Sequence, residues 1–115
     1  MHVTCYHNPR CSKSRQTVHL LQEHGANVKI IEYLKTPPSF EELSAIIQKL
    51  GMVPRDLMRK KELAYKDNNL DDLTLDSETL IKTMIKHPLL IERPIVMANG
   101  KAVIGRPPEL VLTIL

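Results

Sequence analysis

The first third of the chain switches between strand-like and helix-like patterns of apolar positions. Residues 2–6, HVTCY, alternate weakly between apolar and polar and are rich in residue types that favour strands. From Ser12 the apolar positions follow a helical period to about Gly25, where a glycine can adopt the left-handed conformation that ends helices. Residues 28–34, VKIIEYL, form a second strand-like run. The order strand–helix–strand predicts two parallel strands joined by a right-handed crossover.

The middle of the chain carries helical patterns between recognisable start and stop signals. Residues 39–51 begin with the Ser-x-x-Glu spacing of a capping box and end in a glycine, which predicts one helix. Residues 54–63, PRDLMRKKEL, predict one or two short helices that begin at the proline. The polar residues 67–75 are expected to form a loop. A further helix is expected over residues 76–86, with an aspartate or a serine as its cap and a His-Pro pair at its end.

The end of the chain predicts a hairpin followed by a helix. Residues 94–105, PIVMANGKAVIG, place two short apolar runs around Asn99-Gly100, the strongest short hairpin signal. Residues 107–115 predict a closing helix with proline at its start. This order of elements is explained by a four-stranded mixed sheet flanked by helices, an α/β architecture of the thioredoxin-like type. Residues 1–115 are expected to form a single domain.

The composition is that of an ordinary globular protein, with 43% hydrophobic and 25% charged residues. No apolar run approaches the ~20 residues of a membrane helix, and the N-terminus lacks the apolar segment of a signal peptide. The expected location is therefore the cytoplasm, without a membrane partner. The net charge of +3 is spread along the chain, and three tyrosines and one phenylalanine offer few stacking platforms, so no nucleic-acid partner is expected.

The chain contains two cysteines, Cys5 and Cys11. In a reducing cytoplasm they are expected to be free thiols rather than a disulfide. Neither a CxxC motif nor a Cys/His set with zinc-ligand spacing is present, so no metal site is expected.

Cys11 lies between the first predicted strand and the first predicted helix. At a helix N-terminus the unpaired backbone N–H groups and the helix dipole favour a thiolate over a thiol. Arg10, Lys13 and Arg15, with His7 as a possible addition, raise the positive potential of the same loop, which also attracts anions. We therefore expect Cys11 to be a nucleophile whose target is part of an oxyanion.

The neighbouring polar residues each have two interpretations. His7 either influences the thiolate or simply bonds a backbone carbonyl in its loop. Ser14 either simply satisfies first-turn amides or has a role tied to its position, because it occupies the place of the second cysteine of a CxxC motif. A dithiol mechanism within this motif is therefore excluded. Cys5, inside a strand, fits a small buried hydrophobic residue, and the sequence gives it no role.

Residues 6–17, YHNPRCSKSRQT, resemble the active-site motif of the glutaredoxin-dependent arsenate reductases. The resemblance continues through EYLKTPPSFEEL (32–43), RDLMRKKE (55–62) and HPLLIERPIVMANGKAVIGRPPELVLTIL (87–115), and it is strongest to the short bacterial members. It implies a thioredoxin-like core with an inserted helical region. The motif of this chain has Ser12-Lys13 where many family members have Gly-Thr.

The resemblance also implies an activity and a set of roles. Cys11 would attack arsenate to form a covalent adduct, glutathione as co-substrate and glutaredoxin would supply the electrons, and arsenite would be released. No tightly bound cofactor is implied. By motif match the oxyanion would be held by Arg59, Arg93 and Arg106, and the thiolate would be tuned by His7, Ser14 and Arg15. Because thioredoxin-like folds place a cis-proline opposite the active cysteine, the Arg93-Pro94 bond is a candidate cis peptide.

Two other functions remain open at the level of the sequence. A glutathione-dependent thiol reductase of the same fold could use the arginines to bind another anion, because family resemblance supports a site more firmly than a substrate. A regulator of the Spx type, which binds RNA polymerase, shares the fold but usually carries a CxxC switch. This chain has a serine at position 14 instead of the second cysteine, so the regulator is a much weaker candidate than the enzyme.

Overall fold

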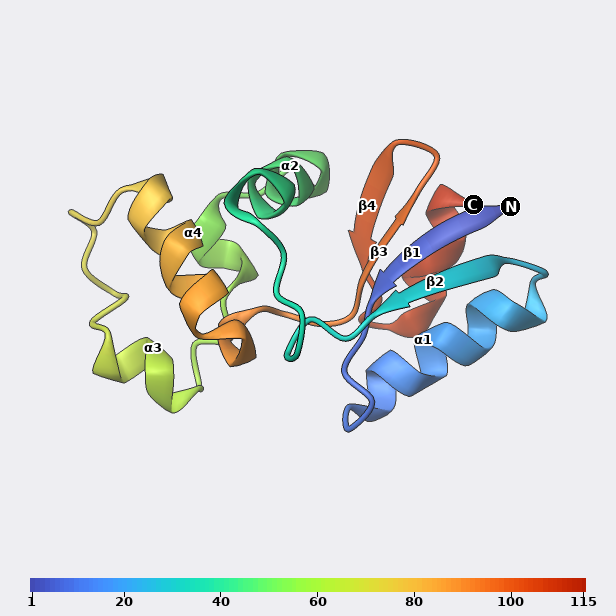
Figure 1. Ribbon diagram of the computed structural model, residues 1–115, viewed down its shortest axis with the longest axis horizontal. Coiled ribbons are helices and arrows are strands. Elements are labelled where there is room, and N and C mark those ends of the chain that lie inside the picture. Colours follow the sequence, from blue (N-terminus) through green and yellow to red (C-terminus); the bar gives the residue numbers. More distant parts are fainter. The chain divides into compact units, whose positions relative to one another are not determined.

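The computed structural model describes residues 1–115, which divide into two compact units. The sheet unit comprises residues 1–36 and 93–115, and the inserted unit comprises residues 37–92 (Figure 1). The inserted unit is helical and interrupts the sheet unit between its second and third strands. The helical insertion implied by the resemblance is thereby confirmed.

The sheet unit is built on four strands, β1 (His2–Tyr6), β2 (Asn27–Ile31), β3 (Ile95–Ala98) and β4 (Lys101–Ile104). Their order in the sheet is β2-β1-β3-β4. β1 pairs with β2 in parallel, whereas β1–β3 and β3–β4 are antiparallel pairs. The predicted mixed sheet and its parallel strand–helix–strand start are confirmed.

The second strand is shorter than the sequence predicted. β2 ends at Ile31, and residues 32–34 lie outside it, although the expected strand extended to residue 34. The physical reason is a turn: the backbone N–H groups of Lys35 and Thr36 both donate to the carbonyl oxygen of Glu32. That carbonyl is therefore engaged locally instead of in the sheet.

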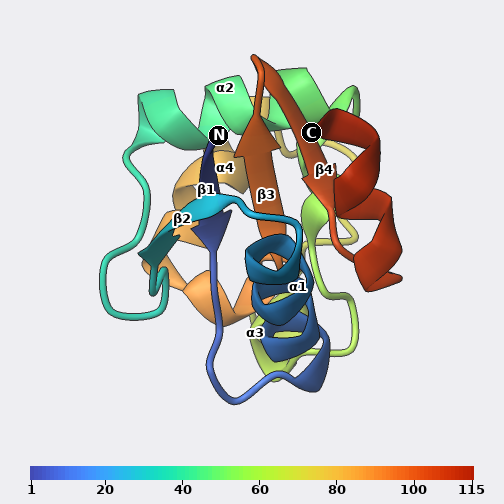
Figure 2. The same ribbon diagram turned by 90° about the vertical axis from the view of Figure 1, so that its right-hand side faces the viewer.

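Two helices cover one face of the sheet. Figure 2 shows α1 (Ser12–Glu23) and the C-terminal 3-10 helix η3 (Pro108–Ile114) on the same side, and they pack against each other. α1 begins where it was predicted and ends two residues before Gly25, whose φ is +78°. The closing helix was predicted, but its 3-10 form was not. The core between sheet and helices contains Val3, Cys5, Leu21, Val96, Ala98, Val111 and Ile114.

The hairpin turn has the conformation that the Asn-Gly pair predicts. Asn99 and Gly100 have φ values of +54° and +72°, the two positive values of a type I′ turn. The Asn99 side-chain amide donates to the backbone carbonyl of Ile114 at 2.9 Å. The turn is therefore tied to the C-terminal helix as well as to its own strands.

The inserted unit contains helices α2 (Phe40–Leu50), α3 (Leu63–Asp67) and α4 (Ser77–Lys86), and 3-10 helices η1 (Pro54–Leu57) and η2 (Pro88–Leu90). The predicted capping box is present, with both reciprocal hydrogen bonds between Ser39 and Glu42. Asp76 is the predicted cap of α4 and accepts from the Thr79 N–H at 2.8 Å. α2 packs against α4. None of the helices in the protein is both long enough and apolar enough to span a bilayer.

Candidate active site

Cys11 occupies the N-cap position of α1, directly before the first helical residue. The loop that holds it follows β1, and the Cys11 N–H donates to the carbonyl of Asn8 at 3.0 Å. The residue as a whole is 9% exposed. The structure thus places the cysteine at the strand-to-helix junction that the sequence predicted.

The surroundings of the sulfur favour the thiolate. Burial raises the pKa of the Cys11 thiol, but the backbone N–H groups of Ser14 and Lys13 and the guanidinium of Arg93 together outweigh burial. The net result is a pKa below the usual value of 9.0. Because the thiolate is the nucleophilic form, this environment activates the sulfur.

Arg106 completes the positive side of the site. Its Nη1 lies 3.8 Å from the Cys11 Sγ and also donates to the backbone carbonyl of Arg93 at 3.4 Å. The two arginines flank the β3–β4 hairpin, and the sheet brings both to the loop after β1. A group of this kind can neutralise one anion and bind a second one beside it.

A buried hydrogen-bond network supports the loop before Cys11. The fully buried Ser14 Oγ accepts from the backbone N–H of Asn8 at 3.0 Å and bonds the Nδ1 of His7 at 2.6 Å. Burial lowers the pKa of His7, Glu32 opposes that change, and Arg15 adds to it. His7 is therefore neutral at neutral pH and contributes hydrogen bonding rather than positive potential.

The basic residues of the loop do not all act on the sulfur. Arg15 Nη1 donates to the carbonyl of Pro9 at 2.8 Å, which fixes the loop. Arg10 and Lys13 have exposed side chains. The arginine that lowers the pKa of the thiol is therefore the distant Arg93, and Arg106 adds a contact to the sulfur at 3.8 Å.

Arg59 lies in the inserted unit. Its Nη1 forms an ion pair with Glu62 at 3.0 Å and contacts the carbonyl of Leu89 at 3.3 Å, and its backbone N–H donates to Leu90. These contacts fix the residue within its own unit. Its predicted role in holding the oxyanion stays a prediction.

The structure also shows contacts that sequence reasoning missed. The peptide bonds Arg93-Pro94 and Arg106-Pro107 are both cis; the first was a candidate and the second was not predicted. Gly105 packs closely against Thr17 of α1 and against Pro94. The only sequence signal for this close contact is that Gly105 directly precedes Arg106. A glycine before an arginine is too common a pair to predict such a contact.

Cys5 differs from Cys11 in every respect that affects reactivity. It lies in β1 with no exposed surface, and burial raises the pKa of its thiol to about 12. Both cysteines are free. Cys5 is therefore an inert core residue, as the sequence suggested.

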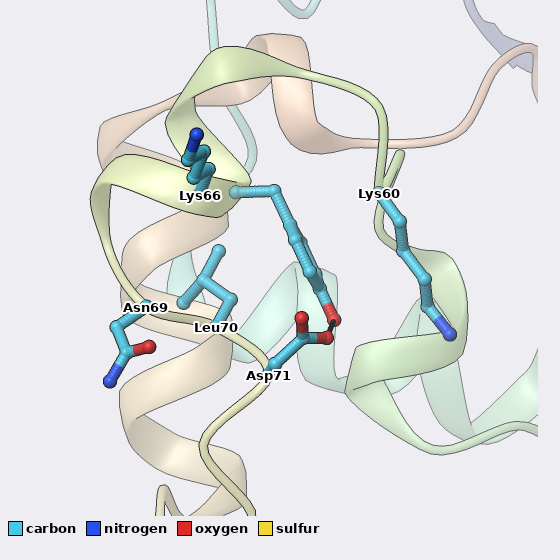
Figure 3. Close-up of a pocket in the computed structure, with 6 residues that line it drawn as sticks. Lys60, Lys66, Asn69, Leu70 and Asp71 are labelled. Carbon is cyan, nitrogen blue, oxygen red and sulfur yellow. Dashed lines mark hydrogen bonds between the residues drawn. The ribbon is translucent and has the colours of Figure 1, made fainter.

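The inserted unit contains a separate cavity of about 430 Å³ (Figure 3). At its wall the Tyr65 hydroxyl donates to Asp71 at 2.7 Å. None of the residues predicted for the site lines this cavity, whose lining is Lys60, Tyr65, Lys66, Asn69, Leu70 and Asp71. No group of three or more His, Cys, Asp and Glu side chains in the protein is placed to hold a metal ion.

Comparison with known proteins matches residues 6–114 to the ArsC family. The protein YfgD of Escherichia coli K12, described as uncharacterized, is 54% identical over 113 residues, which cover 97% of this chain and 95% of the relative. The arsenate reductase of Haemophilus influenzae is 50% identical over 116 residues, with 100% of both chains covered. The solved structure of an arsenate reductase from Vibrio cholerae has 52% identity and a TM-score of 0.97, covering 100% of this chain and 98% of that one.

Proposed function

The chain belongs to the ArsC family, and from this membership and the surroundings of Cys11 we propose that it is an arsenate reductase. The observation that carries the proposal is the Cys11 sulfur beside two guanidinium groups: Arg93 lowers the pKa of the thiol, and Arg106 Nη1 lies 3.8 Å from the sulfur. Such a site combines a nucleophile with the means to bind a tetrahedral oxyanion. Arg59 is proposed as the third arginine on the basis of its motif match.

The first chemical step follows from these groups. The Cys11 thiolate attacks the arsenic atom and a sulfur–arsenic bond forms. One arsenic–oxygen bond breaks, and the hydroxyl of arsenate takes up a proton from solvent and leaves as water. Thiolate and arsenate are both anions, so their approach needs fixed positive charge. Arg93 and Arg106 supply it, because a guanidinium stays charged and donates in a planar fork that suits an oxyanion.

The adduct still contains arsenic(V), and two electrons are needed to reach arsenic(III). The chain offers no second thiol for this, because position 14 is a serine and Cys5 is buried with a thiol pKa of about 12. We therefore propose that one thiol of glutathione and one of glutaredoxin supply one electron each and end joined in a single mixed disulfide. Arsenite leaves and Cys11 returns to the thiolate. This requirement for reduced glutathione suits the cytoplasm.

The direct test is a coupled assay with arsenate, glutathione and glutaredoxin. We expect Cys11→Ser to lose arsenate reduction by at least about 10³-fold, because the nucleophile is absent. Cys5→Ala is the matched control and should keep the activity. Full turnover by Cys11→Ser would exclude the mechanism. Arsenate-independent reduction of a glutathione mixed disulfide, with no arsenate turnover by the wild type, would favour the thiol reductase instead.

A further inference from the structure

The end of β4 comes close to α1 at Gly105, the residue between β4 and Arg106. A Cβ atom added there would lie 2.6 Å from Thr17 Oγ1 and 3.2 Å from Thr17 Cγ2. On its other side it would lie 3.0 Å from Pro94 Cγ. Rotation of the threonine away from this position would break the hydrogen bond of its hydroxyl to the Lys13 carbonyl. Glycine therefore fits at position 105 without adjustment, whereas any side chain there would force neighbouring atoms to move.

Thr17 connects this contact to the helix start that faces the sulfur. Its side chain is fully buried, and its hydroxyl donates to the carbonyl of Lys13 at 2.8 Å. Lys13 lies in the first turn of α1, and its N–H is one of the groups that stabilise the Cys11 thiolate. The Thr17 hydroxyl thus lies against the hairpin end at Gly105 and also bonds the first turn of α1.

Gly105 connects the contact to the guanidinium groups. Its N–H donates to the carbonyl of Pro94 at 2.9 Å, which ties together the segments that carry Arg93 and Arg106. The Arg106 Nη1 is 3.8 Å from the Cys11 Sγ, so a small shift of this segment changes that distance by a large fraction.

We propose that Thr17 and Gly105 are positioning residues for the thiolate site. Their contact sets how closely β4 approaches α1, and thereby how closely the arginine after β4 approaches the cysteine before α1. Neither residue touches the reacting atoms. The inference deepens the proposed function, on which its kinetic readout rests, but its thiol readout requires no arsenate.

The test measures the alkylation rate of Cys11 by iodoacetamide as a function of pH, which reports the thiolate fraction. Below the pKa of the wild-type thiol, Gly105→Ala is expected to slow alkylation about threefold. The new methyl group would press on Pro94, and a shift of Pro94 moves the adjacent Arg93, whose guanidinium lowers the pKa of the Cys11 thiol. Gly105→Ala combined with Thr17→Ala should recover part of the rate, because the two threonine atoms nearest the new methyl group are gone. Buried Cys5 should contribute no alkylation in the folded protein.

Further variants separate positioning from stability. Thr17→Val keeps the shape of the threonine and should retain the pH profile better than Thr17→Ala does. Thr83→Ala is the matched control, because Thr83 makes the same hydroxyl-to-carbonyl bond in α4, at 2.7 Å, within the inserted unit. It should leave the alkylation profile unchanged. In the coupled assay, Gly105→Ala should raise the KM for arsenate more than it lowers kcat.

An unchanged alkylation profile in a folded Gly105→Ala protein would overturn the proposal. So would a double variant no faster than Gly105→Ala alone. If Gly105→Ala does not fold, Thr17→Ala decides: a profile identical to that of Thr83→Ala would show that the contact only stabilises the fold. A shifted profile in a protein that reduces no arsenate would support the positioning role and reject the proposed function separately.

Discussion

At the scale of single residues, the thiolate of Cys11 depends on a few groups rather than on the net charge of its loop. Arg93 lowers the pKa of the Cys11 thiol, whereas Arg10, one position before the cysteine, is exposed and not among the groups that act on it. Arg93→Ala should therefore raise that pKa and move the pH profile of Cys11 alkylation upward. At a fixed pH below the pKa, alkylation slows about tenfold when the profile moves up by one pH unit. Arg10→Ala, which removes the same formal charge, should leave the profile nearly unchanged. Equal changes in the two variants would show that diffuse charge suffices.

Cys5 gives a prediction for stability at high pH. Burial raises the pKa of its folded-state thiol to about 12 from 9.0, so the folded protein keeps the proton that the unfolded chain releases. The stabilisation is fully present below about pH 9 and is lost as the pH rises toward 12, by up to about 1.4 kcal/mol per pH unit. Denaturant unfolding of Cys5→Ala should therefore show a shallower loss of stability above pH 9 than the wild type. Parallel curves for the two proteins would contradict the buried-thiol explanation.

The sequence could locate the nucleophile but could not describe its surroundings. Cys11 lies where a strand pattern gives way to a helix pattern, so its N-cap position follows from local signals. That His7 is neutral depends on burial, and burial is set by the fold rather than by neighbours in sequence. The Thr17–Gly105 contact joins segments 88 positions apart, and no local pattern encodes it.

At the scale of elements, local hydrogen-bonding signals decided which predictions succeeded. The capping box at Ser39 and Glu42 and the Asn99-Gly100 turn were predicted because the side chains or dihedral angles that define them are intrinsic to those residues. The predicted end of β2 was wrong by three residues. The tyrosine and leucine of residues 32–34 favour a strand, but the Glu32 carbonyl is taken by a turn.

The capping box also gives a prediction for the inserted unit. Ser39 accepts the Glu42 N–H at 3.1 Å, and Ser39→Ala leaves that N–H without its side-chain acceptor. We expect the variant to lower the free energy of unfolding by about 1 kcal/mol. Ser77→Ala is the control, because Ser77 begins α4 behind the Asp76 cap and is exposed. Denaturant unfolding measures both variants. Equal losses of unfolding free energy would mean that the capping box contributes no stability beyond that of any exposed serine.

At the scale of the whole molecule, the site depends on long-range order. Arg106 and Cys11 are 95 positions apart, and the pairing of β3 with both β1 and β4 brings them together. The pattern of apolar positions predicts a sheet with these strands, but it does not say which loops meet. The family resemblance supplied that step in the sequence analysis, and the geometry of the sheet unit now gives it a physical basis for Cys11, Arg93 and Arg106.

The proposed activity also gives the inserted unit a role, because Arg59 is proposed to bind arsenate. Comparison of Arg59 with Arg55, four positions earlier, tests this role. Arg55 is structural: its Nε donates to the Leu70 carbonyl and its Nη2 to the Asp72 carbonyl, both at 2.9 Å. Arg55→Ala should therefore lower the free energy of unfolding by about 1–3 kcal/mol and leave the arsenate KM of the folded protein unchanged.

Arg59→Ala should show the opposite behaviour. The ion pair of Arg59 with Glu62 is partly exposed, with 23% and 29% of the two side chains accessible, so its loss should cost at most about 1 kcal/mol of stability. If Arg59 binds the oxyanion, the KM for arsenate should rise about tenfold or more, because a charge-assisted hydrogen bond to the substrate is gone. Thermal unfolding and arsenate kinetics of both variants provide the comparison. A KM that is unchanged in Arg59→Ala, or that rises equally in Arg55→Ala, would remove Arg59 from the proposed site.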